Sequence, residues 1–489
     1  MPRPAVIGLD IGTTSAKAVL FDLTGAALAT AQQVIGLSTP RPGWAEQDPA
    51  ELWAAVQSVL RQVAMQAGGA GVRVAAVSLA SQCGSLLPAR ADGTPLSPII
   101  TWIDSRATGV VARWQADGTA ETIRRVSGWH PQPGLGLAIA AWLRETQPAT
   151  FAAAEHYFSA NDYILHCLSG QKITDVSCAN ELLLMDVASG QWSAELCALA
   201  GIRPEQLSAP DWSGVAVGPV TPAVSKATGL PPDTLVVNSG HDHCCEALAL
   251  GITEPGKLLL TCGTAWVITG VADSPSLAAL PAAMDLNFHV LPNRWTVSQF
   301  LGALGPTVEW WLTHGLQSPD AAAPLPRAEL YAAFDRLVGQ SAPGSNGLLF
   351  APPGAAGRTA GGFAGLRLDH TRADLSRAVL EGAAFELRSA LETLRAAGQP
   401  AAHLWLLGGA TRSPHWPQIL ADVTGVPLTT TRYAHWAALG AAILAGAGAG
   451  LLAAESAHTQ FTPPTRTIEP NRALAGLYAD SFARYRTLA

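Results

Sequence analysis

The sequence contains few charged residues and no dense cluster of either sign. Of its 489 residues only 14% are Asp, Glu, Lys or Arg, whereas 48% are hydrophobic. That balance excludes an extensively disordered chain, which would carry more charge and too little apolar surface to form a core. The net charge of −7, without a run of Lys or Arg, argues against a partner that is a nucleic acid.

Long apolar runs, paired cysteines and a leader segment are also lacking. The most apolar stretch, residues 437–454, is rich in Gly and Ala and too weakly hydrophobic for a membrane span. The seven cysteines include no Cys-x-x-Cys pair, and the adjacent Cys244 and Cys245 have poor geometry for an ordinary disulfide. The N-terminus leads directly into a predicted strand. We therefore expect a reduced, cytoplasmic protein without a signal peptide or membrane segment, organised in about two to four domains.

The most informative feature that is present lies near the N-terminus. An apolar run, residues 6–9, delivers Asp10 and breaks into Gly12-Thr13-Thr14 before a second strand pattern over residues 18–22. Glycine lets backbone N–H groups turn toward an anion, and threonine adds hydroxyl donors. A carboxylate beside such a phosphate-binding loop predicts a Mg²⁺ site at Asp10. The alternative is a β-hairpin whose turn merely contains Gly and Thr.

The chain has two halves with a similar rhythm, which predicts an α/β fold. The second half repeats the pattern of apolar strand, Gly-Thr turn and apolar strand over residues 258–268. Helical patterns lie at residues 51–67, 375–396 and 416–423, between strands that include residues 74–79 and 403–407. Pro and Gly at residues 251–256 predict a boundary between domains 1–251 and 252–489. Pro319, Pro324 and Pro326 predict a surface loop.

A second acidic residue also follows an apolar strand pattern. Asp242 comes after the run 235–237 and before a helical segment, so it is well placed to accept a proton from a hydroxyl. Two other interpretations stay open. His241 and His243 on either side suggest a metal site, although no third ligand cluster is evident, and Asp242 alone would also suit a structural helix cap.

Five motifs in this order resemble the FGGY family of carbohydrate kinases, which share an actin-like, two-domain ATPase architecture. They are residues 8–14, 240–242, 262–264, 361–381 and 408–416. The resemblance implies two actin-like (ribonuclease H-like) domains that face a central nucleotide and sugar cleft. It also implies ATP and Mg²⁺ as cofactors, a sugar as the small-molecule substrate, and Asp242 as the catalytic base.

The resemblance assigns further roles to individual residues. Asp10 would hold Mg²⁺, and the nucleotide would be bound by Thr13, Thr14, Lys17, Gly263, Thr264, Gly305, Gly408, Gly409, Ala410 and Ser413. The acceptor pocket would draw on Gln82, Asp104, Arg106, Asp242 and His243. Arg106 also has a purely structural interpretation, an ion pair with Asp104. For Trp102 we predict core packing ahead of contact with the sugar.

The acceptor pocket departs from the family pattern. Xylulose kinases commonly carry Gln-Met-His where this chain has Gln82-Cys83-Gly84, and glycerol kinases carry Arg-Glu there. The change predicts either a roomier pocket or a substrate with different hydroxyl stereochemistry. It leaves the prediction of ATP use intact, because the nucleotide motifs lie elsewhere.

The leading hypothesis is therefore ATP-dependent phosphorylation of a ketopentose such as D-xylulose. Gluconate and polyol kinases of the same family are alternatives, and a catalytically inactive sugar- or ATP-binding regulator is an alternative of another class. A nicotinamide dehydrogenase is disfavoured, because the first strand lacks Gly-x-Gly-x-x-Gly. A homodimer is the default expectation for oligomeric state.

Overall fold

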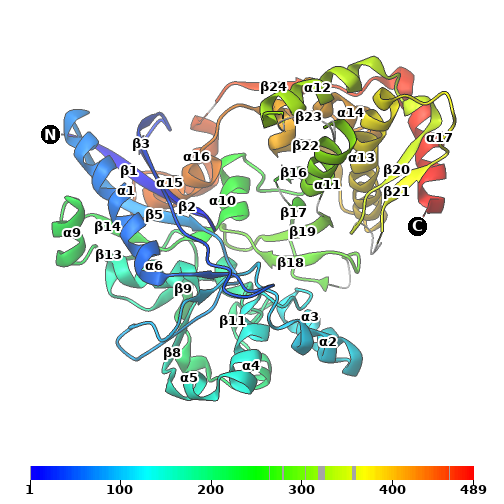
Figure 1. Cartoon of the computed structure of the whole chain (residues 1–489). Helices are drawn as coiled ribbons and strands as arrows, with labels where there is room; N and C mark the ends of the chain where they lie inside the picture. The colour runs from blue at the N-terminus through cyan, green and yellow to red at the C-terminus, as the bar shows by residue number, and fades with distance from the viewer. Residues whose placement is uncertain are drawn as a thin grey trace.

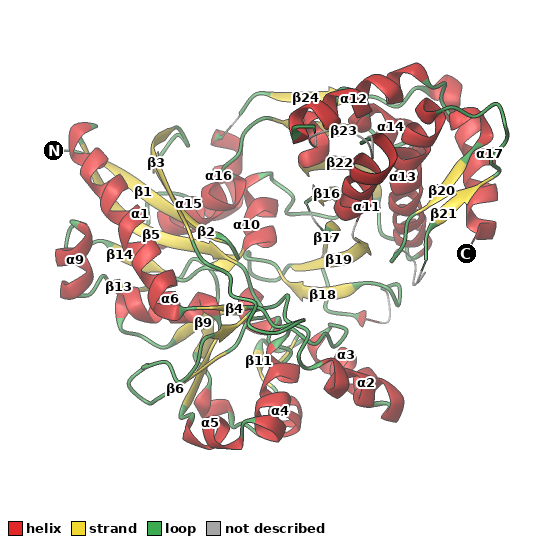
Figure 2. Cartoon of the chain, viewed as in Figure 1, coloured by secondary structure: helices red, strands yellow, loops and turns green. Residues whose placement is uncertain are grey.

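The computed structural model contains two seven-stranded sheets, each flanked by helices (Figures 1 and 2). The structure describes residues 2–263, 265–277, 280–302, 304–317, 325–354, 360–461 and 463–488. Thr264, Pro319 and Pro324 lie outside these residues, so the predictions that concern them are not addressed. The predicted two-lobed α/β architecture is confirmed.

The first sheet has the strand order β13-β14-β5-β1-β2-β3, and β15 pairs with β5 beside β14. Its strands are β1 (Arg3–Ile11), β2 (Ser15–Asp22), β3 (Ala27–Val34), β5 (Val72–Ser81), β13 (Ala216–Pro219), β14 (Leu235–Val237) and β15 (Gly240–His241). The second sheet has the order β18-β19-β17-β16-β22-β23-β24. Its strands are β16 (Gly256–Cys262), β17 (Trp266–Ala272), β18 (Asp285–Phe288), β19 (Trp295–Gly302), β22 (Ala401–Gly408), β23 (Leu428–Thr431) and β24 (Thr465–Ile468).

Helices cover both sheets, and five of those within residues 108–200 pack instead around a separate core. They are α1 (Pro49–Gly69), α2 (Thr108–Asp117), α3 (Thr119–Ser127), α4 (Gly136–Thr146), α5 (Pro148–Ala153), α6 (Ala160–Ser169), α7 (Val176–Asn180), α8 (Ala194–Ala200), α9 (Pro222–Thr228), α10 (Asp242–Ala249), α11 (Leu304–Trp310), α12 (Arg327–Gln340), α13 (Arg372–Ala396), α14 (Trp416–Thr424), α15 (Trp436–Gly448), α16 (Ala454–Ala457) and α17 (Ala475–Tyr485). Short two-stranded ladders pair β4 (Glu46–Gln47) with β7 (Ile99–Ile100), β6 (Leu87–Ala89) with β8 (His156–Phe158), β9 (Ile173–Asp175) with β12 (Ala209–Asp211), β10 (Met185–Asp186) with β11 (Gln191–Trp192), and β20 (Leu349–Ala351) with β21 (Gly362–Ala364).

The three helices predicted from periodicity are present as α1, α13 and α14, and local signals set their ends. Asp48 caps α1 by accepting a hydrogen bond from the backbone N–H of Ala50, with Pro49 at the first helical position. Thr371 and Asp374 form a capping box at the start of α13. Pro326 lies immediately before α12. Proline lacks the backbone N–H that an interior helical position needs, so it is tolerated at the start of a helix.

The two sheets repeat one arrangement, as the sequence predicted. β1 runs antiparallel to β2 and parallel to β5, while β16 runs antiparallel to β17 and parallel to β22. Each Gly-Thr motif thus follows the first strand of a hairpin. The hairpin alternative for residues 12–14 is correct as a description of the backbone, and it does not exclude a phosphate-binding turn.

One helix from late in the sequence packs on the first sheet. α15 contacts β1, β5 and α10, and in Figure 1 it lies beside them, far along the chain from the first strands. The packing is close enough to require glycine, because a Cβ on Gly8 would lie 1.8 Å from the Ala438 carbonyl oxygen and one on Gly440 would lie 2.0 Å from the Cys245 carbonyl oxygen. The resulting apolar core joins the two halves of the chain.

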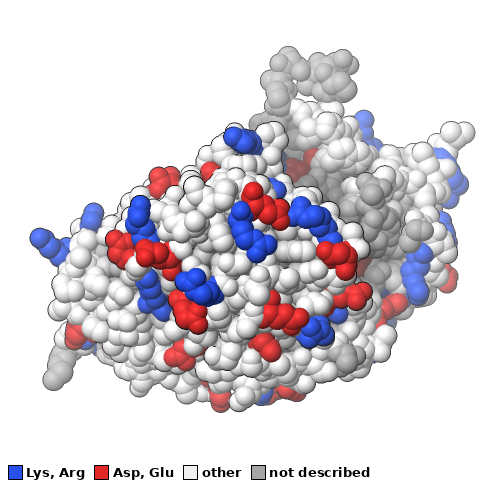
Figure 3. Space-filling view, turned by 90° about the horizontal axis from the view of Figure 1, so that it is seen from below, with Lys and Arg blue, Asp and Glu red and all other residues white. Residues whose placement is uncertain are grey.

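Both charge signs are present on the face of the molecule that Figure 3 shows. On the face in Figure 3 the Lys and Arg side chains are interspersed with Asp and Glu, and no region of that face is dominated by one sign. Among the described residues, no helix combines the length and apolar character that crossing a membrane requires.

Candidate active site

The register of the first sheet brings the two predicted acidic residues to one edge. Asp10 pairs with Ala80 of β5, and Gly240 of β15 pairs with the same residue from the other side. β1, β5 and β15 are parallel, so their carboxyl ends meet, and Asp242 begins α10 directly after β15. Burial raises the pKa of Asp10, and the negative charge of Asp242 adds to that rise, as expected for two carboxylates at the same edge of the sheet.

Asp10 is paired with a lysine rather than left alone. Its Oδ2 accepts a hydrogen bond from Lys17 Nζ at 3.0 Å, across the β1–β2 hairpin. Burial raises the pKa of Asp10, and the opposing charge of Lys17 offsets only part of that rise. Asp10, beside a Gly-Thr turn and at the same sheet edge as Asp242, offers the hard oxygen ligand that suits Mg²⁺ with its retained waters. The donor set therefore fits the predicted ion, with Asp10 as the residue that would hold it.

Asp242 is held by its two histidine neighbours. Asp242 Oδ1 accepts a hydrogen bond from the backbone N–H of His243 at 2.7 Å, and His241 Nε2 lies 3.0 Å from the same oxygen. Burial alone would raise the pKa of Asp242, but the charges of His243 and His241 and these contacts lower it to about 2. Asp242 is therefore ionised, as a base must be before it accepts a proton.

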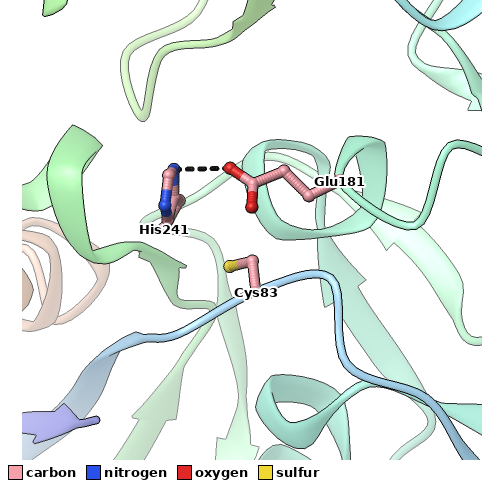
Figure 4. Close-up of side chains that lie close together, drawn as sticks. All are labelled: Cys83, Glu181 and His241. Carbon is pink, nitrogen blue, oxygen red and sulfur yellow. Dashed lines mark ion pairs between the residues drawn. The ribbon is translucent and has the colours of Figure 1, made fainter. Parts of the chain in front are cut away.

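Behind His241 lies a carboxylate that the sequence analysis missed. Glu181 Oε1 is 2.9 Å from His241 Nδ1, and Cys83 approaches the same pair, as Figure 4 shows. Asn287 of β18 donates a hydrogen bond to Glu181 at 3.2 Å, from the opposite half of the chain. A signal existed, because Glu181 is a lone charge directly before three leucines, and a charge buried in an apolar stretch requires a partner.

The predicted sugar and phosphate residues meet in a closed network. Thr13 Oγ1 donates to Gln82, Gln82 donates to Gln47, and the Gln47 amide donates to the Thr13 carbonyl, at 2.7–2.9 Å. The Trp102 indole N–H donates to Thr13 Oγ1 at 3.1 Å. The prediction that Trp102 packs in the core is wrong, because its side chain is 43% exposed. The indole instead covers the Gly-Thr turn.

Arg106 and Asp104 are buried against one another. The guanidinium contacts both Asp104 oxygens at 2.8–2.9 Å and Glu46 at 2.7 Å, and it stacks on the Trp44 ring at 3.7 Å. The Arg106 side chain is only 2% exposed. The structure therefore contains the ion pair that the structural interpretation required, and contact of either residue with a sugar stays a prediction.

Gly84, which stands where xylulose kinases commonly carry His, does not leave an empty space. Gly84 has a φ of +81°, and a Cβ there would lie 2.4 Å from Leu135 Cδ2. Leu135 thus occupies the volume that a side chain at position 84 would need. The roomier pocket predicted from Cys83-Gly84 is not found at Gly84.

A cavity of about 570 Å³ in the second lobe contains five of the ten predicted nucleotide residues. Gly263, Gly305, Gly409, Ala410 and Ser413 all line it. Thr13, Thr14 and Lys17 belong to the β1–β2 hairpin of the first lobe and do not line it. Gly408 does not line it either; its φ of +93° and a Cβ position 2.3 Å from the Cys262 carbonyl oxygen make it the point where β22 passes the end of β16.

The same cavity contains side chains that the motifs did not identify. Arg327, Tyr331 and Asp335 project into it from successive turns of α12, and Ser413 Oγ donates a hydrogen bond to Asp335 at 2.6 Å. Spacing of four residues on a helix places them on one face. That face was not recognised because nothing in its sequence distinguishes it from an ordinary solvated helix.

Two groups of described residues could offer ligands to a metal ion. They are Cys83, Glu181 and His241, and His241, Asp242 and His243. In both groups His241 already faces a carboxylate with each ring nitrogen. A histidine with both nitrogens so engaged has no lone pair to donate, which argues against the metal interpretation of the His-Asp-His segment.

Comparisons with known proteins identify the family of the chain. The N-terminal domain model of the FGGY family of carbohydrate kinases matches residues 5–249, and the C-terminal domain model of the same family matches residues 258–449. The L-xylulose/3-keto-L-gulonate kinase of Escherichia coli is 28% identical over 99% of this chain and 96% of the relative. The gluconokinase of Bacillus licheniformis is 26% identical over 90% of this chain and 86% of the relative. The crystal structure of xylulose kinase from Rhodospirillum rubrum superposes with a TM-score of 0.90 at 30% identity, covering 99% of this chain and 98% of that one.

Proposed function

The chain belongs to the FGGY family of carbohydrate kinases, and we propose that it transfers the γ-phosphoryl group of ATP to a hydroxyl of a ketopentose such as D-xylulose. ATP-dependent phosphorylation of a small carbohydrate is the activity of the family. The ketopentose is the finer inference. It is supported by the relatives named as xylulose kinases, including the R. rubrum protein at 30% identity.

The observation that carries the proposed chemistry is the ionised Asp242 at the edge of the first sheet. An ionised carboxylate accepts the acceptor's hydroxyl proton while the hydroxyl oxygen attacks the γ-phosphorus. Phosphoryl transfer depends mainly on positioning and on neutralising charge. Mg²⁺, held by Asp10, would neutralise charge on the nucleotide phosphates.

Other residues serve binding in this proposal. The Gly12-Thr13-Thr14 turn and Lys17 approach the phosphates from the first lobe. The 570 Å³ cavity holds the nucleoside in the second lobe, where glycines let the backbone come close. Gln82 and His243 present polar groups to the sugar, and the exposed Trp102 ring lies beside Thr13 of the same network.

The test measures ADP release with ATP and Mg²⁺ against a panel of ketopentoses, aldonates and polyols. We expect one ketopentose to raise turnover far above the rate without acceptor. Asp242→Asn should then lose about 10²–10⁴-fold in kcat, because it keeps the shape but not the base. Asp233→Asn, an exposed carboxylate paired with Arg73, is the matched control and should keep full activity.

The outcomes separate the candidates. If gluconate gives the highest turnover, the proposed acceptor is gluconate and not a ketopentose, in line with the B. licheniformis relative named gluconokinase. No stimulation by any member of the panel, with ATP bound normally, would favour a sugar-binding regulator. Full activity of Asp242→Asn would remove Asp242 from the chemistry.

A further inference from the structure

The carboxylate of Asp242 is engaged on one oxygen only. The His243 backbone N–H and the His241 ring both contact Oδ1, at 2.7 and 3.0 Å. In the described part of the chain, no hydrogen bond or ion pair reaches Oδ2. The side chain is 30% exposed, so this free oxygen has access to a bound molecule.

His241 is itself fixed from behind. Its Nδ1 lies 2.9 Å from Glu181 Oε1, and its backbone N–H donates to Ser177 Oγ at 2.9 Å. Glu181 and His241 are only 8% and 12% exposed, so neither has freedom to turn toward solvent. Asn287 holds Glu181 from β18. A continuous chain of contacts thus runs from the second sheet through Glu181 and His241 to Asp242.

We propose that Glu181 and His241 are positioning residues that reserve Oδ1 of Asp242 for the protein, so that Oδ2 receives the proton of the acceptor hydroxyl. This inference rests on the proposed role of Asp242 as the base. The acceptor O–H bond breaks and its proton passes to Oδ2. The acceptor oxygen forms a bond to the γ-phosphorus, the bond from that phosphorus to the bridging oxygen breaks, and ADP leaves.

The charges around Glu181 and His241 support this arrangement. Burial would lower the pKa of His241, but the negative charge of Glu181 and the contact with Asp242 raise it well above its usual value. His241 is therefore an imidazolium between two carboxylates. Cys83, Cys244 and His243 are the other titratable groups that face it, and the Cys83 thiol stays neutral because burial raises its pKa to about 12.

A metal site formed by Cys83, Glu181 and His241 is the competing interpretation of the same cluster. Metal binding needs a thiolate and a neutral imidazole. Here the thiol is protonated and donates a hydrogen bond to the Ser81 carbonyl at 3.3 Å, and the imidazole is charged. Since each group is already satisfied within the protein, the positioning role explains the cluster better.

The test compares five variants with the wild type: Asp242→Asn, His241→Phe, His241→Gln, Glu181→Gln and the double variant Glu181→Gln/His241→Phe. His241→Phe should lower kcat about 10²-fold with the KM for ATP unchanged, because orientation of the base is lost while the nucleotide cavity lies elsewhere. His241→Gln can still donate to Oδ1 and should recover about tenfold of that loss. The double variant Glu181→Gln/His241→Phe should be no slower than His241→Phe alone, since Glu181 acts through His241.

Controls distinguish this inference from the proposed function. His370→Phe, in the loop before α13, should leave kcat and KM unchanged. Full activity of Asp242→Asn would overturn the proposed base. Loss of activity in Asp242→Asn together with full activity in His241→Phe would overturn only the positioning role, as would additive losses in the double variant.

A second readout requires no acceptor. In protein labelled with ¹⁵N-histidine, the ring resonances of His241 are identified by their absence in His241→Gln. Both ring nitrogens should resonate as protonated donors, and both Glu181→Gln and Asp242→Asn should shift them. Ring resonances that do not change in Asp242→Asn would contradict the contact on which the inference depends.

Discussion

Lys17 Nζ lies 3.0 Å from Asp10 Oδ2, so the lysine of β2 neutralises the carboxylate that ends β1. The two side chains are 18% and 24% exposed, which limits screening by solvent. The sequence predicted that Lys17 contacts a phosphate and that Asp10 holds Mg²⁺. In the proposed reaction, phosphate binding by Lys17 and Mg²⁺ binding by Asp10 would therefore depend on the same ion pair.

Lys17→Met should make the enzyme more sensitive to acid. Burial already raises the pKa of Asp10, and loss of the opposing charge of Lys17 raises it further. A higher pKa keeps the carboxyl protonated to higher pH, so the acid limb of kcat/KM for ATP should move up by about one pH unit. The measurement is the pH profile at saturating acceptor. Lys226→Met, on the exposed face of α9, is the control, and an equal shift there would contradict the prediction.

Arg106→Met should destabilise the fold rather than act only on substrate binding. The substitution leaves Asp104 buried without its cation, and breaking a buried pair costs about 3–5 kcal/mol. Arg113→Met removes an exposed partner of Glu145 and should cost at most about 1 kcal/mol. Urea unfolding measures both. Unchanged stability of Arg106→Met with a raised KM for the sugar would favour direct contact with the substrate.

Local patterns were sufficient to predict the framework, because it is built from short-range signals. The two strand–turn–strand patterns, the helices α1, α13 and α14, and the position of Asp242 after a strand all follow from residues close in sequence. The fold of the family then followed from the order of the motifs.

Long-range partners could not be predicted in the same way. Glu181 meets His241 across 60 positions of sequence, and Gln47 meets Gln82 across 35. The exposure of Trp102 depends on its hydrogen bond to Thr13, 89 positions away. Such contacts are set by how elements pack, and a residue's type and immediate neighbours carry little information about them.

Trp102→Phe should raise the KM for the acceptor without unfolding the protein. Phenylalanine keeps most of the exposed apolar face but loses the N–H that holds Thr13, a hydrogen bond worth about 1 kcal/mol or roughly fivefold in affinity. Because the side chain is 43% exposed, the free energy of unfolding should change by less than about 1 kcal/mol. Steady-state kinetics check the first part. Trp310→Phe, equally exposed in the second lobe, should leave the acceptor KM unchanged.

Gly440→Ala should disrupt the contact between α15 and α10. Its Cβ would lie 2.0 Å from the Cys245 carbonyl oxygen, and backbone atoms cannot move aside as a flexible side chain can. We expect a loss of several kcal/mol, about 3 or more, together with reduced activity because α10 carries Asp242. Gly476→Ala meets nothing within 4 Å on α17 and should be neutral or stabilising by up to about 1 kcal/mol. Thermal unfolding of the two variants gives the comparison.

Ser413→Ala should act on the nucleotide alone. Ser413 Oγ holds Asp335 at 2.6 Å on the wall of the cavity, so the substitution releases one carboxylate in the nucleoside site. We expect the KM for ATP to rise about three- to tenfold at unchanged kcat, the signature of binding lost equally in the ground and transition states. Asp335→Asn should produce a similar rise because it weakens the same contact. Ser456→Ala, exposed on α16, should change nothing. A fall in kcat at constant KM would instead contradict a role of Ser413 in nucleotide binding alone.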